Sequence, residues 1–158
     1  MPRVTVIGIG SSFGDDQAGW RVAESLAGSA RRVADAGRTV IAACRSPGGE
    51  LPGLLATAEV AIVVDAVVNG GAPGTVYRLS SLRWPAALVS GRLSSHGLGL
   101  RAMLEMMETL EDLPKELVIY GIEAGDVATD AAMSPGVLRG VSRVTAEIER
   151  DIRHYGQR

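Results

Sequence analysis

Two kinds of hydrophobic pattern alternate along the chain. Short runs rich in β-branched and other apolar residues predict strands, and between them apolar residues recur every three or four positions, which predicts amphipathic helices. The run Val60 to Val64 is continuously apolar, as expected for a central strand covered on both faces, and Asp65 is expected to close it. The other predicted strands are Arg3 to Ile9, Thr39 to Cys44, Thr75 to Leu79 and Glu116 to Ile122.

Four segments have helical periodicity. Pro47-Gly48-Gly49 is expected to break the chain before the second of them, whereas Ser134 and Pro135 supply an N-cap and a first-turn proline for the last. The predicted helices are about Gln17 to Ala30, Glu50 to Ala58, Gly97 to Leu110, and a final helix from Pro135. Their clearest apolar stripes are Leu100, Met103, Leu104, Met107 and Leu110 in the third, and Val137, Val141, Val144, Ile148 and Ile152 in the last.

Strands that alternate with helices predict a single α/β domain over residues 1–158. The expected core is a twisted, five-stranded, mostly parallel sheet with helices on both faces. Turn residues at Asn69-Gly70-Gly71 and Pro73-Gly74 make the link after the third strand too short for a crossover helix, so the fourth strand is expected to be antiparallel. The loops Ser80 to Ser95 and Glu123 to Met133 are long enough to suggest functional segments.

Composition narrows the classes of protein that fit. With 158 residues, 46% hydrophobic and 22% charged, the chain is a typical globular domain, and its net charge of −2 gives no electrostatic case for nucleic acid or anionic membrane as a partner. No apolar stretch approaches the roughly 20 residues of a membrane span, and the first apolar run is too short for a signal peptide. A single cysteine, Cys44, rules out an intramolecular disulfide, so we expect a cytoplasmic protein.

Two known folds, a dinucleotide-binding domain and a response-regulator receiver, share some of these sequence features. Gly8-Ile9-Gly10 suggests a dinucleotide-binding loop, but Phe13 replaces the third glycine and the carboxylates of Asp15-Asp16 would face a pyrophosphate. A response-regulator receiver also has an acidic pair after its first strand and an aspartate after its third. The receiver's lysine after the fifth strand is missing, since the only lysine here, Lys115, precedes that strand.

Three side chains converge on the carboxyl edge of the predicted sheet. Asp16 follows the first strand, Asp65 ends the third, and His96 precedes the Gly97 helix. Two carboxylates and one imidazole could form a divalent-metal site with open positions, suited to meeting a metal transiently. Each residue also has a structural interpretation: Asp16 as a favourable charge at a helix N-terminus, Asp65 as a loop cap, and His96 as a surface residue.

Other candidates at this edge are weaker. Ser94 and Ser95 precede His96, but adjacent residues rarely share a proton and serine is a common N-cap. Cys44 is expected to be a small buried hydrophobic residue. Glu123 could orient His96 or meet a basic substrate residue. Met103, Met106 and Met107 could form an adaptable docking surface, although Met103 and Met107 fit the core stripe of their helix.

A series of short motifs occurs in a fixed order along nearly the whole chain. They are Gly8-Ile9-Gly10 with Asp15-Asp16 and Gly19, then Val63-Val64-Asp65-Ala66, Ala72-Pro73-Gly74-Thr75, Ser95-His96-Gly97-Leu98-Gly99-Leu100, Leu113-Pro114, Gly121-Ile122-Glu123 and Met133-Ser134-Pro135. Each is weak alone, but in this order and spacing the chain resembles the nickel-iron hydrogenase maturation proteases.

That resemblance implies an endopeptidase that removes a C-terminal extension from the precursor of a hydrogenase large subunit after nickel insertion. It also implies that Asp16, Asp65 and His96 contact the substrate's nickel, so that the metal arrives with the substrate and no cofactor is bound permanently. Asp16→Ala or His96→Ala is then expected to abolish processing while the fold keeps its stability, since substitutions in surface loops usually cost within about 0.5 kcal/mol.

The chain departs from the family pattern at two places. Ser11 stands where an asparagine is common, and Cys44-Arg45-Ser46-Pro47-Gly48 replaces a segment that is often Gly-Gly-Thr-like and bears on substrate choice. An alternative is therefore a binding module or chaperone that recognises the nickel-loaded precursor without cutting it. A third hypothesis is a phosphoacceptor domain that uses Asp65.

Overall fold

A computed structural model describes residues 2–33, 38–80, 98–125 and 132–158, and its core is a five-stranded sheet of order β2-β1-β3-β5-β4. Strands β1, β2, β3 and β5 are parallel, and β4 pairs antiparallel with β5, as predicted. The strands are β1 (Val4–Ile9), β2 (Thr39–Cys44), β3 (Val60–Val67), β4 (Val76–Ser80) and β5 (Glu116–Glu123). The helices are η1 (Gly14–Gln17, a 3-10 turn), α1 (Ala18–Val33), α2 (Pro47–Leu55), α4 (Leu98–Thr109) and α5 (Pro135–Gly156).

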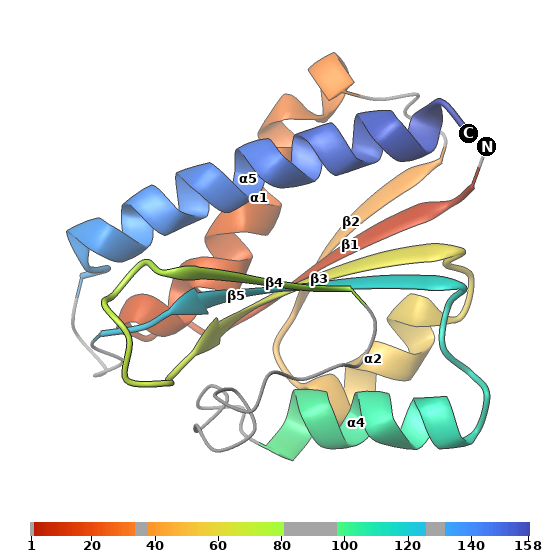
Figure 1. The fold of residues 1–158 in the computed structure, drawn as a ribbon, viewed down its shortest axis with the longest axis horizontal. Helices are drawn as coiled ribbons and strands as arrows, with labels where there is room; N and C mark the ends of the chain where they lie inside the picture. Colours follow the sequence, from red (N-terminus) through yellow and green to blue (C-terminus); the bar gives the residue numbers. More distant parts are fainter. Residues whose placement is uncertain (1, 34–37, 81–97, 126–131) are drawn as a thin grey trace.

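Helices cover both faces of the sheet (Figure 1). Helices α1 and α5 lie on one face, and α2 and α4 lie on the other. Because side chains alternate along a strand, β3 divides between the two cores: Ile62 and Val64 pack toward α1 and α5, whereas Ala61 and Val63 pack toward α2 and α4. Both faces are therefore dry, which explains the continuous apolar run in this strand.

The glycines of the first motif let α1 lie directly against β1. A Cβ atom at Gly8 would come within 2.1 Å of the Gly19 carbonyl oxygen, and one at Gly19 would come within 2.0 Å of the Ile9 carbonyl oxygen. Both distances are far inside van der Waals contact, so neither position tolerates a side chain without movement of the backbone. The loop thus serves close packing of helix on strand, and it carries η1 to the carboxyl end of the sheet.

Several predicted boundaries and burials are wrong. Helix α2 begins at Pro47, because proline suits a first helical turn, so the Pro47-Gly48-Gly49 segment starts the helix that it was expected to precede. Asp65 lies inside β3, since pairing with β5 continues to Val67. Leu110, expected in the core stripe of α4, is 60% exposed.

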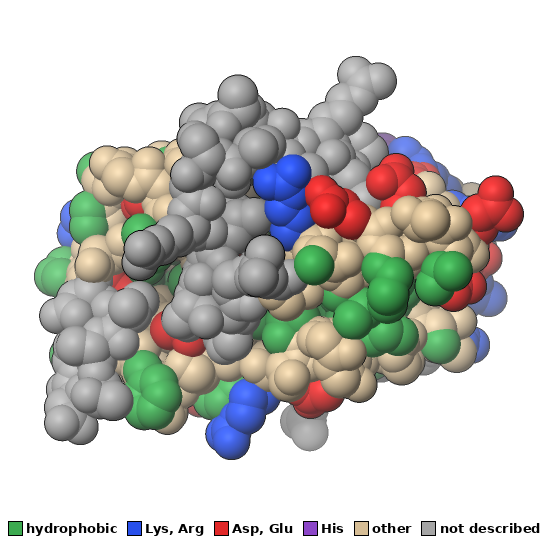
Figure 2. All heavy atoms as spheres, turned by 90° about the horizontal axis from the view of Figure 1, so that it is seen from below, with side chains coloured by type: hydrophobic (Ala, Val, Ile, Leu, Met, Phe, Trp, Pro, Cys, Tyr) green, Lys and Arg blue, Asp and Glu red, His purple; other side chains and the backbone are tan. Residues whose placement is uncertain are grey.

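The exposed side of α4 adds to an apolar surface. Figure 2 looks onto the face covered by α2 and α4, where hydrophobic side chains gather. Met106 is exposed in this helix, whereas Met107 is buried and Met103 packs partly against the core. The expected division of the methionines is thus confirmed for Met103 and Met107.

The sheet rules out the receiver interpretation. A receiver has five parallel strands in the order 2-1-3-4-5. Here β5 lies next to β3, and β4 lies at the edge of the sheet beyond β5. Strand β4 also runs antiparallel to β5, unlike any strand of a receiver.

Candidate active site

The candidate site lies where the parallel strands end. In the strand register, Ile9 pairs with Cys44, and Gly8 pairs with Val64, the residue before Asp65. Strands β1 and β2 stop at this level, whereas β3 and β5 continue for two more residues. Asp65 therefore stands beside the point where β1 gives way to a loop, which is where α/β sheets bind ligands.

Asp65 faces the side of the sheet that α2 and α4 cover. Its strand neighbours Val63 and Val67 belong to that core, and alternation places Asp65 on the same face. The side chain is 3% exposed, and its Oδ1 atom is excluded from solvent. A carboxylate buried in this way needs compensating polar partners, which is typical of a functional or strongly hydrogen-bonded group.

Asp16 reaches the same edge from η1, which packs against β3. Its Oδ2 atom accepts a hydrogen bond of 2.5 Å from the Ser11 hydroxyl, and that hydroxyl accepts a bond of 3.3 Å from the Phe13 N–H. The Asp16 side chain is only 2% exposed. The premise that Asp16 is a surface-loop residue is therefore wrong, and truncation to alanine would disturb packing as well as chemistry.

The acidic pair divides into two roles that the sequence does not distinguish. Asp15 is fully buried, and its Oδ1 accepts the Ser134 N–H at 2.6 Å. Its Oδ2 accepts the Ser134 hydroxyl at 2.6 Å and the Gly125 N–H at 2.8 Å. These partners lie 119 and 110 residues along the chain, so no local signal marks the interaction. Asp15 ties the loop that carries Asp16 to α5 and to the end of β5.

Ser134 is consequently an N-cap of a different kind from the one expected. It occupies the position before α5, but no capping hydrogen bond from its side chain to the helix is made. Its hydroxyl donates instead to Asp15. The prediction of its position is confirmed, and the tertiary contact decides what its hydroxyl does.

His96 lies outside the described residues, so its place in the site remains a prediction. The nearest described element is α4, which begins two residues later at Leu98. Its first turn lies against α2, since a Cβ at Gly99 would be 3.7 Å from Pro47, and α2 follows the carboxyl end of β2. Helix α4 therefore starts at the edge that holds Asp16 and Asp65. Among residues 2–33, 38–80, 98–125 and 132–158, no group of three metal-ligating side chains occurs.

Glu123 closes the β3–β4 connection. Its Oε1 accepts the N–H groups of Asn69 at 2.8 Å and Gly71 at 3.0 Å, and its Oε2 accepts the Tyr77 hydroxyl at 3.2 Å. The side chain is 1% exposed. Glu123 thus holds the segment that connects β3 to β4 and crosses the end of β5. Its buried carboxylate has this structural role, and not the predicted contact with a basic side chain of the substrate.

Cys44 is a buried thiol at the end of β2, as expected. It is fully buried, and burial together with the neighbouring Glu50 carboxylate raises the pKa of the thiol to about 12. Glu50 itself accepts the N–H groups of Ser46 at 2.6 Å and Arg45 at 3.0 Å, and these bonds lower its pKa. A thiol that stays protonated near neutral pH is a poor nucleophile.

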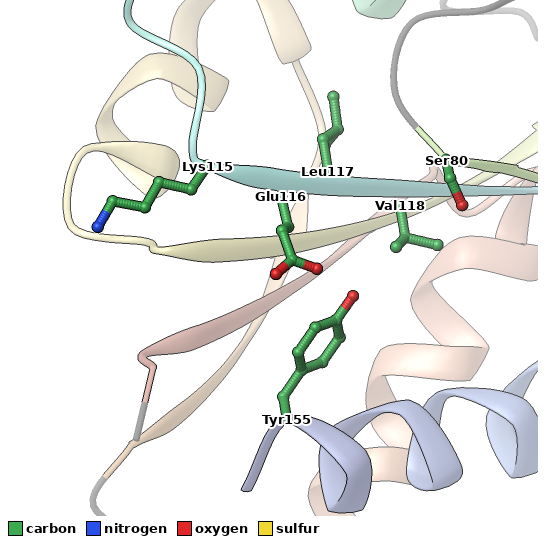
Figure 3. Close-up of a pocket in the computed structure, with 6 residues that line it drawn as sticks. All are labelled: Ser80, Lys115, Glu116, Leu117, Val118 and Tyr155. Carbon is green, nitrogen blue, oxygen red and sulfur yellow. The ribbon is translucent and has the colours of Figure 1, made fainter. Parts of the chain in front are cut away.

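A separate pocket lies at the opposite edge of the sheet (Figure 3). It has a volume of about 270 Å³ and lies near the start of β5. Glu116 and Tyr155 point toward one another there, and burial and the bond to Glu116 raise the pKa of Tyr155. The pocket is remote from the carboxyl ends of the parallel strands, so it is a poor candidate for the active site.

Comparisons with known proteins give a consistent family. The family model for hydrogenase maturation protease matches residues 22–151. Hydrogenase 2 maturation protease of Escherichia coli is 28% identical over 156 residues, which cover 98% of this chain and 93% of the relative. The hydrogenase expression/formation protein HupD of Thiocapsa roseopersicina is 27% identical over 158 residues, 99% of this chain and 69% of the relative.

Solved structures agree with the sequence comparisons. The hydrogenase maturating endopeptidase HybD from Escherichia coli superposes with a TM-score of 0.78 at 26% identity, over 98% of this chain and 94% of that one. A [NiFe] hydrogenase maturation protease, HybD from Thermococcus kodakarensis, has a TM-score of 0.74 at 22% identity, over 94% of this chain and 97% of the other, and so shares the fold. Among the described residues, no helix is both long and apolar enough to cross a membrane.

Proposed function

The chain belongs to the hydrogenase maturation protease family, and on this premise we propose that it is an endopeptidase that removes the C-terminal extension of a nickel-iron hydrogenase large-subunit precursor. The family match over most of the chain and the shared fold support a peptidase. The proposal includes action in the cytoplasm, where a buried free thiol such as Cys44 stays reduced.

The substrate's nickel is proposed as the recognition element. Asp16 and Asp65 are two buried carboxylates that reach one sheet edge from neighbouring strands, and this juxtaposition is the observation that carries the proposal. Carboxylate and imidazole are suitable ligands for Ni²⁺, so His96 would complete the set from the segment before α4. The metal would arrive with the substrate and leave with it.

Such a site would act as a checkpoint for nickel insertion. A precursor without nickel would present no cation to the carboxylates of Asp16 and Asp65, so it would lack the metal contacts that favour docking. A loaded precursor would supply those contacts and bring the bond to be cleaved into register. A bound metal supplies Lewis-acid polarisation of a carbonyl when it lies close enough.

The test is the intact mass of a nickel-loaded large-subunit precursor after incubation with this protein. Loss of a C-terminal peptide is expected with the wild type, and no loss is expected with nickel-free precursor or with Asp16→Asn, Asp65→Asn or His96→Ala. Glu24→Gln on the exposed side of α1 is the matched control, because the Glu24 side chain is 73% exposed. Thermal melts of each variant separate loss of chemistry from loss of fold.

Each other outcome contradicts a defined part of the proposal. Cleavage of nickel-free precursor would refute the checkpoint but leave the peptidase intact. Full activity of Asp16→Asn would remove that residue from the site. A stable complex with loaded precursor and no change in mass would favour the non-proteolytic binding module.

A further inference from the structure

An indole ring is fixed at the carboxyl edge of the sheet, against the ends of β1 and β2. The Trp20 Nε1 atom donates to the Cys44 carbonyl oxygen at 3.0 Å. Its ring also packs on Gly10, where a Cβ atom would be 3.0 Å from two ring carbons. The hydrogen bond and the packing hold the ring in one orientation, so its exposed part is a preformed surface.

Arg45 lies on this surface. Its guanidinium carbon is 5.5 Å from the centroid of the Trp20 ring, which is cation–π distance. Its backbone N–H is held by Glu50, and the same Glu50 oxygen also accepts the Ser46 N–H. The backbone and the side chain of Arg45 are thus both positioned.

The Arg45 guanidinium is available, as far as the described residues go, to an external partner. Its charge helps to lower the pKa of Glu50, yet Glu50 spends its hydrogen bonds on backbone N–H groups. Within the described parts of the chain, no carboxylate forms a salt bridge with Arg45. Arg45 is thus an oriented cation at the ends of the strands.

The loop after β1 contacts the Trp20 ring under this cation and also leads to Asp16 of the proposed nickel site. A Cβ at Gly10 would be 2.8 Å from the Asp16 carbonyl oxygen and 3.0 Å from two ring carbons of Trp20, so the Asp16 backbone and the indole ring both pack against Gly10. The next residue, Ser11, donates to Asp16. Phe13, in the same loop, is 46% exposed and adds an apolar side chain to the surface of that loop.

We propose that Arg45, stacked on Trp20, binds a carboxylate of the precursor's C-terminal extension beside the nickel site. This inference rests on the proposed function and adds the chemistry of the substrate. A guanidinium fork matches a carboxylate in geometry, and stacking reduces the side-chain entropy lost on binding. Because Asp16 and Asp65 repel a substrate carboxylate, Arg45 also fixes the register in which the extension lies, with its acidic group away from them.

The experiment measures steady-state processing of nickel-loaded precursor by wild type, Arg45→Gln, Arg45→Lys and Trp20→Leu. For Arg45→Gln we expect KM to rise about tenfold, as for loss of one charge-assisted pair, with kcat nearly unchanged. Arg45→Lys should recover part of the loss, and Trp20→Leu should weaken binding because the cation loses its platform. Arg143→Gln is the matched control, since Arg143 is a 65% exposed arginine on α5 that pairs within its helix.

Two arms distinguish the source of the carboxylate. Precursors in which each Asp or Glu of the extension is changed in turn to Asn or Gln test side chains. Competitor peptides of the extension with a free or an amidated C-terminus test the terminal carboxylate. With the true partner removed, wild type and Arg45→Gln should have equal KM values.

The proposal is overturned if Arg45→Gln keeps the KM of Arg143→Gln, or if no carboxylate in the extension affects the difference between wild type and Arg45→Gln. Failure of the proposed function has a different signature, because the wild type itself would then leave the loaded precursor at full mass. A change in kcat alone would place Arg45 in a different role and also refute the inference.

Discussion

Asp15 accepts both the backbone N–H and the hydroxyl of Ser134, each at 2.6 Å, although Ser134 lies 119 residues further along the chain. A third bond, from the Gly125 N–H, completes a buried cluster around one carboxylate. The cluster joins the loop after β1, the end of β5 and the start of α5. The loop that carries Asp16 is therefore anchored to the end of β5 and the start of α5 through Asp15.

Asp15→Ala is expected to lower the free energy of unfolding by about 3 kcal/mol, because two buried N–H groups lose their acceptor. The measurement is urea unfolding followed by circular dichroism. Ser134→Ala, which removes one of the three bonds, should cost about 1 kcal/mol. Equal stabilities of Asp15→Ala and Glu24→Gln would show that the cluster contributes nothing.

Ser11→Ala is expected to reduce processing about tenfold, because Asp16 loses the 2.5 Å bond that orients its Oδ2 atom. Ser11→Thr keeps a hydroxyl at the same place and should restore most of the activity. Both variants should melt close to wild type, since Ser11 is only half-buried. Direct titration of the variants with a nickel-bearing peptide provides a second readout, and unchanged affinity and rate in Ser11→Ala would count against an orienting role.

Cys44 is expected to resist alkylation in the folded protein. Its pKa rises from an ordinary value of 9.0 to about 12, which at pH 8 leaves about a thousandfold less thiolate than in the unfolded chain. Iodoacetamide labelling followed by mass spectrometry should be slow in buffer and fast in urea. Rapid labelling of native protein would mean that the thiol is accessible and ionised.

The same raised pKa predicts the pH dependence of stability. Because the folded state keeps the Cys44 proton more tightly than the unfolded state, this contribution is complete below pH 9.0 and is lost as the pH rises through about 12. Cys44→Ala should show a smaller decline of melting temperature between pH 9 and pH 11 than the wild type. Parallel curves for the two proteins would contradict the assignment.

Tyr120→Phe is expected to destabilise the protein by about 1 to 2 kcal/mol, since a buried hydroxyl bridges two charged groups. Its oxygen donates to Asp151 at 2.7 Å and accepts from Arg78 at 3.0 Å, which joins β5 to α5 and β4. Burial raises the pKa of this phenol, so it remains protonated at physiological pH. Urea unfolding of Tyr120→Phe measures the cost, and a variant as stable as wild type would show that Arg78 and Asp151 compensate fully.

The sequence by itself determined the elements and the edge at which the candidate site lies. Apolar runs and helical stripes follow from local periodicity, so β1, β2 and β5 lie within about a residue of their predicted bounds. Parallel strands end at one edge, which places Asp16 and Asp65 together without knowledge of any contact. The motifs in order gave the family, because their spacing reflects the same packing requirements.

Only the tertiary structure decided what each polar group does. Asp15 and Asp16 are neighbours of the same type, yet one accepts bonds from two distant loops and the other faces Ser11. Glu123 holds the link between β3 and β4, a role that exists because β4 lies beyond β5. Local patterns predict most of the buried apolar side chains, since their burial follows periodicity. The partner of a buried carboxylate depends on which backbone N–H groups the fold leaves unsatisfied nearby, and those groups come from segments far apart in the sequence.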